Sequence, residues 1–188
     1  MHRCDWVGQN KPHYESYHDN EWGKPLHDDN QLFEMLILEG AQAGLNWETI
    51  LLRREGYRKA FHQFIPNRVA MMADDELEAL LTNASIIRNR LKVWSARKNA
   101  RVFLDIQQQY GSFDRYLWNF VDGKPIINRP KAMKDVKTTS AEAIALSNDL
   151  RKKGMSFVGP TILYAYMQAT GLVNDHLQTC FLCPSSGV

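Results

Sequence analysis

Apolar residues recur at helical spacing in the first half of residues 28–50, DDNQLFEMLILEGAQAGLNWETI, and predict an amphipathic helix. The apolar positions that share one stripe of this helix are Leu32, Met35, Leu36 and Ala43. Glu39 falls in the middle of the stripe, and Glu34 falls on the opposite side. Asp28 or Asp29 can cap the N-terminus of the helix, and Gly44 can end it in a left-handed turn.

Glu39 is the unusual residue of this stretch, because a carboxylate on an apolar face is costly to bury without a partner. Trp47 follows the tight turn, just after Asn46, which can cap the next helix. Two interpretations remain open at this point. Glu39 is either a core carboxylate bonded to backbone N–H groups or an acid that faces a cavity beside an aromatic ring.

The rest of the chain repeats the helical pattern, and we predict an all-α protein with one domain that spans residues 1–188. Further helices are expected at residues 46–61, 74–81, 88–109, 113–121, 140–153 and 161–170, and in a short segment that follows Asn174. Ser112 and the capping box Thr139-x-x-Glu142 mark two of the starts. Residues 123–137 are predicted to be a loop, and residues 1–27 an irregular but ordered segment, since disordered arms lack aromatics.

Composition changes this picture little, with 44% hydrophobic and 23% charged residues among 188. The sequence has no apolar run of transmembrane length and no signal-peptide core at its start, so a cytoplasmic protein is expected. Three cysteines indicate free or metal-bound thiols rather than a disulfide scaffold.

Positive charge is concentrated in two places although the net charge is only +2. Residues 88–101 hold six basic residues and no acidic one, and residues 151–153 form a second basic cluster. A charge run is usually a solvated helix face, but an unbalanced basic helix also suits a phosphate backbone.

Possible metal ligands lie near both ends of the chain. His176 and Cys180 are four residues apart, which would place them on one face of a helix, and Cys4 and His18 lie near the start. These four residues make a set that suits tetrahedral zinc, with no open position left for catalysis. From spacing alone the favoured interpretation is that they are unrelated polar or core residues, and Cys180-x-x-Cys183 is a competing chelate.

The predicted helices at residues 140–153 and 161–170 are joined by a turn that Gly154 opens and Gly159 and Pro160 close. Backbone N–H groups at the start of the second helix can bind a phosphate, and residues 151–153 add positive charge beside them. The alternative is an ordinary helical hairpin.

Five motifs together resemble 3-methyladenine DNA glycosylase I, a family of the helix-hairpin-helix glycosylase superfamily. They are CxW near the start, YHDNEWG at residues 17–23, LEGxQAGLxW at 38–47, FVGxT at 157–161 and GLVNDHLxxC at 171–180. The resemblance spans nearly the whole chain. It implies one structural zinc that joins the termini, with Cys4, His18, His176 and Cys180 as ligands and Cys183 free.

The resemblance also implies a base-excision repair enzyme that flips 3-methyladenine out of double-stranded DNA and hydrolyses its N-glycosidic bond. An aromatic pocket can hold such a cationic base by stacking and cation–π attraction. The expected base-binding residues are Tyr14, Tyr17, Trp22, Glu39 and Trp47, with Glu39 also the catalytic candidate. The released base is the expected product.

For DNA contact the resemblance leads us to expect Gly44, Leu45, Lys153, Gly159 and Thr161, with Leu45 filling the gap that the flipped base leaves. No lysine occurs in residues 154–180, where lyase members of the superfamily carry a Schiff-base amine, so a hydrolase without lyase activity is expected. A monomer is expected.

Two departures from the superfamily pattern stand out. Phe157 occupies a hairpin position that is often glycine, and Asp175, near the usual place of a catalytic aspartate, lies beside His176 and is given no catalytic role. The competing interpretation is a zinc-stabilised DNA-binding module without catalysis.

Overall fold

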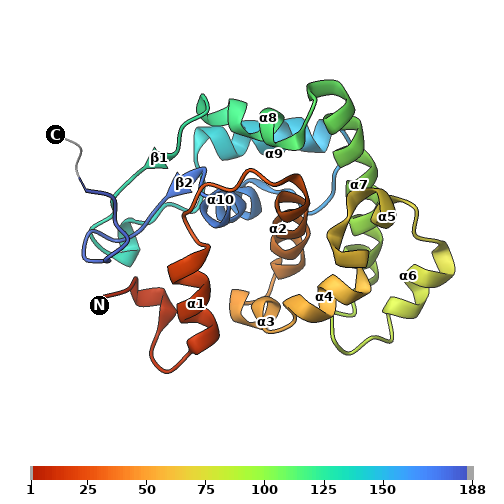
Figure 1. The fold of residues 1–188 in the computed structure, drawn as a ribbon, viewed down its shortest axis with the longest axis horizontal. Coiled ribbons are helices and arrows are strands. Elements are labelled where there is room, and N and C mark those ends of the chain that lie inside the picture. The colour runs from red at the N-terminus through yellow and green to blue at the C-terminus, as the bar shows by residue number, and fades with distance from the viewer. Residues whose placement is uncertain (1, 186–188) are drawn as a thin grey trace.

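The computed structural model describes residues 2–185 and is mostly helical, as predicted (Figure 1). Its α-helices are α1 (Pro12–Asn20), α2 (Asp29–Gln42), α3 (Trp47–Leu51), α4 (Arg54–Ala60), α5 (Pro66–Ala70), α6 (Asp74–Leu80), α7 (Arg90–Tyr110), α8 (Phe113–Trp118), α9 (Ala141–Lys152) and α10 (Pro160–Ala169). Short 3₁₀ turns lie at Asp5–Val7, His62–Phe64, Asn119–Val121 and Met133–Asp135. The exception to the all-α prediction is a parallel pair of two-residue strands, β1 (Ile126–Ile127) and β2 (Val173–Asn174), in which Ile126 pairs with Val173.

Helix α2 lies at the centre of the molecule, between α10 and α7 (Figure 1). The prediction of an amphipathic helix is wrong, because every residue from Leu32 to Ala41 is buried. Glu34, expected on a polar face, is buried in ion pairs, with its Oε1 2.5 Å from Arg54 Nε and 3.0 Å from Arg58 Nε. Charge pairing therefore lets the polar side of α2 pack inward.

Two of the predicted helix caps, Asp28 and Ser112, are confirmed. Asp28 accepts a hydrogen bond from the Gln31 N–H at 2.9 Å, and Ser112 accepts one from the Arg115 N–H at 3.0 Å. The cap of α9 is Ser140 rather than the predicted Thr139.

Three predicted elements differ from the structure. The helix expected at residues 46–61 is divided into α3 and α4, and the N-terminal segment expected to be irregular contains α1. No helix follows β2 in the part of the chain that the structure describes. Asn174 instead ends β2, and its Oδ1 accepts a hydrogen bond from the His176 N–H at 3.2 Å.

The N-terminal and C-terminal segments lie on the same side of the molecule (Figure 1). Gly23 N–H donates to Gln168 O at 2.9 Å, and Leu26 N–H donates to Thr170 O at 3.0 Å, so the N-terminal segment follows the end of α10. Gly171 permits this approach, because a Cβ on it would lie 2.2 Å from the Lys24 carbonyl carbon. Among the described residues, no helix has the length and apolar character needed to cross a membrane.

Candidate active site and metal-binding cluster

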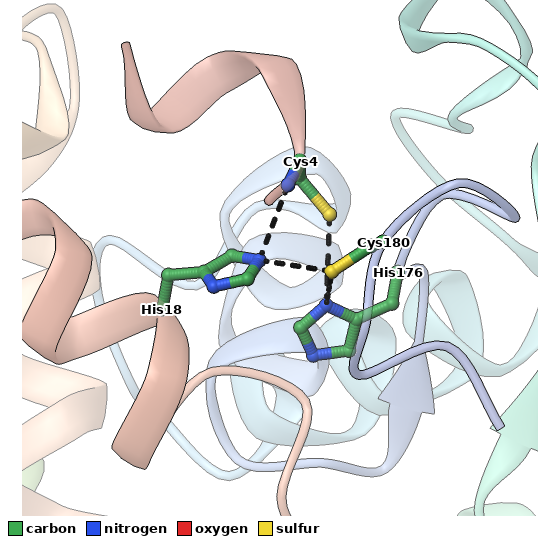
Figure 2. Close-up of side chains that lie close together, drawn as sticks. All are labelled: Cys4, His18, His176 and Cys180. Atoms are coloured by element: carbon green, nitrogen blue, oxygen red, sulfur yellow. Dashed lines mark hydrogen bonds between the residues drawn. The ribbon is translucent and has the colours of Figure 1, made fainter. Parts of the chain in front are cut away.

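The side chains of Cys4, His18, His176 and Cys180 meet in one buried cluster (Figure 2). Their ligand atoms all lie within 4.8 Å of one another. Cys4 precedes the first 3₁₀ turn, His18 lies on α1, and the other two follow β2. The predicted proximity of the four residues is confirmed. His176 and Cys180 do not lie on the predicted helix, because a single turn, in which Cys180 N–H donates to Leu177 O at 2.8 Å, brings them together.

The cluster has the donor set and the spacing of a tetrahedral metal site. Cys180 Sγ lies 3.4 Å from His18 Nε2 and 3.5 Å from His176 Nδ1, which is also 3.5 Å from Cys4 Sγ. Ligands on a tetrahedral zinc ion, at about 2.3 Å for sulfur and about 2.0 Å for nitrogen, are about 3.5 Å apart. The four residues could therefore hold a metal ion.

Neighbouring groups orient the two imidazoles, as is usual around a metal. His18 Nδ1 lies 2.8 Å from Asp19 Oδ1, and His176 Nε2 lies 3.2 Å from the carbonyl oxygen of Trp22. Burial lowers the pKa of His18 and lowers that of His176 to about 4, so both rings are neutral and able to act as ligands. Burial raises the pKa of the Cys4 thiol to about 12, which makes a bare thiolate unfavourable there.

A cavity of about 220 Å³ lies beside the cluster. All five residues predicted to bind a base line it, and three segments supply them. Tyr14 and Tyr17 come from α1, Glu39 from α2 and Trp47 from the first residue of α3, while Trp22 follows α1. The other lining residues are Trp6, Gln42, Met133, Val136, Ala165, Gln168 and Asp175.

Aromatic rings form most of one wall of this cavity. The ring centroids of Tyr17 and Trp47 are 5.4 Å apart, and Trp6 packs edge-on against Tyr14 at 5.3 Å and Trp22 at 5.1 Å. Such rings present electron-rich faces that can bind a flat heterocycle or a cation.

Glu39 is only 4% exposed, and its Oε2 has no hydrogen-bond partner among the described residues. Buried indole N–H groups of Trp6 and Trp47, which also line the cavity, lack a partner in the same way. Desolvation raises the pKa of Glu39 to about 8, so the carboxyl of the free protein is mostly neutral at pH 7. Unpaired buried polar atoms are costly, and a ligand in the cavity could supply the missing partners.

Asp175 also lines the cavity but has a different environment. Its carboxylate accepts hydrogen bonds from Tyr164 Oη at 2.8 Å and from the side-chain amides of Gln168 and Asn128, each at 2.7 Å. It is buried, and neither caps a helix nor bonds to the His176 ring. Three donors hold this carboxylate in place and satisfy its charge.

Helices α9 and α10 meet at a turn that packs directly against α2. The Cβ of Phe157, in the left-handed region with φ of 57°, would lie 3.2 Å from a Cβ placed on Gly40. Gly159 is the N-cap residue of α10, and the Arg151 guanidinium lies beside it, 3.3 Å from the place of a Cβ. Thr161 is exposed in the first turn of α10.

Lys153 lies elsewhere. Its Nζ is 3.7 Å from Asp149 Oδ2 and lies over the rings of Tyr110 and Tyr116, at 5.5 and 5.9 Å from their centroids. The prediction that Lys153 contacts DNA stays a prediction, and Arg151 is the basic residue beside Gly159. Leu45, 41% exposed, follows Gly44 in the turn between α2 and α3.

Comparison with known proteins decides the family. The sequence profile of the methyladenine glycosylase family matches residues 6–183. The chain belongs to the methyladenine glycosylase family. It is 46% identical to DNA-3-methyladenine glycosylase 1 of Escherichia coli over 186 residues, which cover 99% of each chain.

Solved structures of 3-methyladenine DNA glycosylase I share the fold. One crystal structure, 49% identical, superimposes with a TM-score of 0.94 over 97% of this chain and 100% of its own. A structure that describes 3-methyladenine recognition by the Staphylococcus aureus enzyme is 38% identical, with a TM-score of 0.94 over 100% of this chain and 99% of its own.

Sequence reasoning missed Trp6 and Gln168 in the cavity of this methyladenine glycosylase family member. Trp6 had a signal, since it lies in the CxW motif two residues after Cys4. Gln168 had none, because its orientation depends on Asp175, which reaches the cavity only through the chain reversal after α10.

Proposed function

We propose that this protein is a DNA glycosylase that releases 3-methyladenine from alkylated double-stranded DNA. The observation that carries the proposal is the buried, unpartnered Glu39 oxygen in an aromatic cavity. The E. coli relative is named as a DNA-3-methyladenine glycosylase, and the S. aureus structure is described by its recognition of 3-methyladenine. An aromatic cavity with an unpaired acid supports the same base for this chain.

The flipped base binds between the aromatic rings, with its exocyclic amine donating to the free oxygen of Glu39. A cationic base stabilises the carboxylate form, so binding lowers the pKa of Glu39 from its raised value and releases the carboxyl proton. Stacking on Tyr17 and Trp47 adds cation–π attraction.

The bond that breaks joins the sugar carbon to the base nitrogen, and its electron pair neutralises the positive charge of the base. Water supplies the oxygen that bonds to the sugar carbon and loses a proton to solvent. The residues that line the cavity include no lysine, which supports hydrolysis without a Schiff base or strand cleavage.

DNA is held, in this proposal, by two turns beside the cavity. The N-terminus of α10 at Gly159 and Thr161 binds a backbone phosphate in a helix-hairpin-helix arrangement, with Arg151 rather than Lys153 beside it. Gly44 allows the turn that exposes Leu45, and Leu45 fills the space that the flipped base leaves. We expect a cytoplasmic protein. We also expect a monomer, which a measurement of the mass in solution can check.

The buried Cys2His2 cluster is proposed to bind one structural zinc ion. The ligand spacings support a tetrahedral ion, and four protein ligands leave no position for a substrate. Cys183 is not among the four clustered residues and is proposed to remain free. Zinc would then join the N-terminal segment to the segment that follows β2.

Base release from methylated duplex DNA tests the proposed activity. Free 3-methyladenine should appear without strand cleavage, and a parallel reaction with unmethylated DNA should release no base. DNA binding without base release would instead support a non-catalytic zinc-stabilised module and overturn the proposal.

A further inference from the structure

Lys92 joins α7 to the end of α2. Its Nζ donates to the carbonyl oxygens of Ala41 at 2.8 Å and Ala43 at 2.6 Å. These carbonyls belong to the last turn of α2 and its C-cap, where helix carbonyls have no partner within the helix. Lys92 therefore caps a helix other than its own.

The position of Lys92 is otherwise unfavourable. It lies in the first turn of α7, three residues after the N-cap Asn89, where the helix dipole disfavours a cation. The side chain is half-buried, and desolvation lowers its pKa. The negative end of the α2 dipole and two charge-assisted hydrogen bonds offset both costs.

The turn that Lys92 caps has little other support. Gly44 has a φ of 77°, and no atom within 4 Å meets a Cβ placed there. Leu45 N–H donates to Gln42 O at 2.6 Å, and Asn46 then caps α3 by accepting from the Thr49 N–H at 2.8 Å. The capped carbonyls of residues 41 and 43 thus lie between Glu39 and Leu45.

The same face of α7 also holds the turn between α9 and α10. Asn99, seven residues after Lys92, donates from Nδ2 to Ser156 O at 2.9 Å and accepts from the Ser156 N–H at 2.9 Å. Residues seven apart lie on one face, two helical turns or about 10 Å apart. Helix α7 thus binds both turns proposed to contact DNA through side chains on one face, and this sets the spacing between them.

We propose that Lys92 is a positioning residue that acts through Leu45, by fixing the turn at residues 43–46 relative to the turn at residues 153–159. The expected effect on excision rests on the proposed DNA glycosylase function, whereas the capping of α2 by Lys92 is independent of it. Without the cap, Leu45 enters the duplex less often, while the base cavity is unchanged.

Amide hydrogen exchange without DNA tests the cap alone. Lys92→Met keeps the aliphatic stem and removes the donor, so the Leu45 amide should exchange about tenfold faster, as expected for loss of a charge-assisted hydrogen bond. The control is Lys98→Met, the same change on an exposed face of α7, where Nζ donates to the Ser156 hydroxyl at 3.2 Å and to no other group among the described residues. Unchanged exchange in Lys92→Met, or equal acceleration in both variants, would overturn the inference.

A double-mutant cycle tests the route through Leu45. Single-turnover excision by Lys92→Met should be about tenfold slower at unchanged affinity for free 3-methyladenine, and adding the substitution to Leu45→Ala should change the rate less than twofold. If the rate effects of Lys92→Met and Leu45→Ala multiply, and Lys92→Met lowers the salt dependence of DNA binding by one phosphate contact, then Lys92 contacts DNA directly and the inference is overturned. If the parent releases no base, the proposed function fails, whereas the exchange result still decides the cap.

Discussion

The Cys2His2 cluster and the base cavity are adjacent, and Trp22 belongs to both. Its side chain lines the cavity, while its carbonyl oxygen lies 3.2 Å from Nε2 of the cluster residue His176. Within the cluster, every ligand atom faces another ligand at 3.4–3.5 Å. In the cavity, Glu39 Oε2 faces no partner among the described residues.

This difference separates a structural site from a binding site. Four mutually facing donors could enclose a metal ion and would leave no position open, so the cluster could stabilise the chain but could not receive a substrate. An unpaired acid with a raised pKa lowers stability until a ligand pairs with it. Mutations in the two regions should therefore have opposite effects on stability.

The largest effect is expected from Cys4→Ala. Loss of one ligand should release the metal and lower the free energy of unfolding by more than about 4 kcal/mol, since structural zinc supplies folding energy directly. Metal analysis and denaturant unfolding measure the two effects. The molecules that remain folded should bind free 3-methyladenine as the parent does.

Cys183→Ala is the matched control, because Cys183 lies outside the cluster and, within residues 2–185, its thiol donates a hydrogen bond only to the carbonyl of Pro184, at 3.8 Å. It should retain zinc and stability. Metal-free parent protein, or equal zinc loss from the two variants, would contradict the proposed ligand set.

The second effect concerns the stability cost of Glu39. Below pH 4.5 its carboxyl is protonated in both folded and unfolded chains, but between 4.5 and about 8 only the folded chain keeps the proton. The stability of the parent should therefore fall by up to about 1.4 kcal/mol for each pH unit in this window. Glu39→Gln lacks this titration. The difference in unfolding free energy between Glu39→Gln and the parent should therefore shift in favour of the variant by about 3 kcal/mol from pH 5 to pH 8.

Unfolding curves of both proteins at several pH values between 5 and 8 measure this difference. The other ionisable groups are the same in both proteins, so their contribution cancels in the comparison. A constant difference over the whole range would show that the Glu39 pKa is not raised in the folded protein.

The smallest effect is expected from Leu45→Ala, outside both regions. Excision from duplex DNA should lose about 1–2 kcal/mol of transition-state stabilisation, because the truncated side chain buries less apolar surface in the duplex. Zinc content, stability and affinity for the free base should stay at parental values. A parental excision rate would remove Leu45 from the proposed DNA contacts.

Features that depend on neighbouring residues in the chain were predicted correctly from the sequence. Asp28 and Ser112 cap their helices because capping depends only on residues within one turn. The burial of Glu39 followed from its position on an apolar stripe, and tertiary structure added the burial of Glu34 through arginines 20 and 24 residues away.

The sequence prediction failed for segments whose residues contact different parts of the molecule. Helix α1 shows little amphipathic pattern because Tyr14 and Tyr17 line the cavity while His18 joins the cluster. The spacing of His176 and Cys180 indicated a helix, but one turn achieves the same proximity. The unpaired oxygen of Glu39 depends on the cavity that segments far apart in the sequence leave between them, which no local pattern encodes.

The most direct test of the account compares Glu39→Gln with the parent by titration with free 3-methyladenine and by single-turnover excision. Glutamine keeps the shape but removes the negative charge that pairs with the cationic base of alkylated DNA and that strengthens the hydrogen bond to the neutral released base. We predict a folded, zinc-loaded variant in which binding and excision are each weakened by about 1.5–3 kcal/mol, the range for a hydrogen bond to a charged group. Parental binding and excision in this variant would show that Glu39 is only a core carboxylate, and would contradict the central claim.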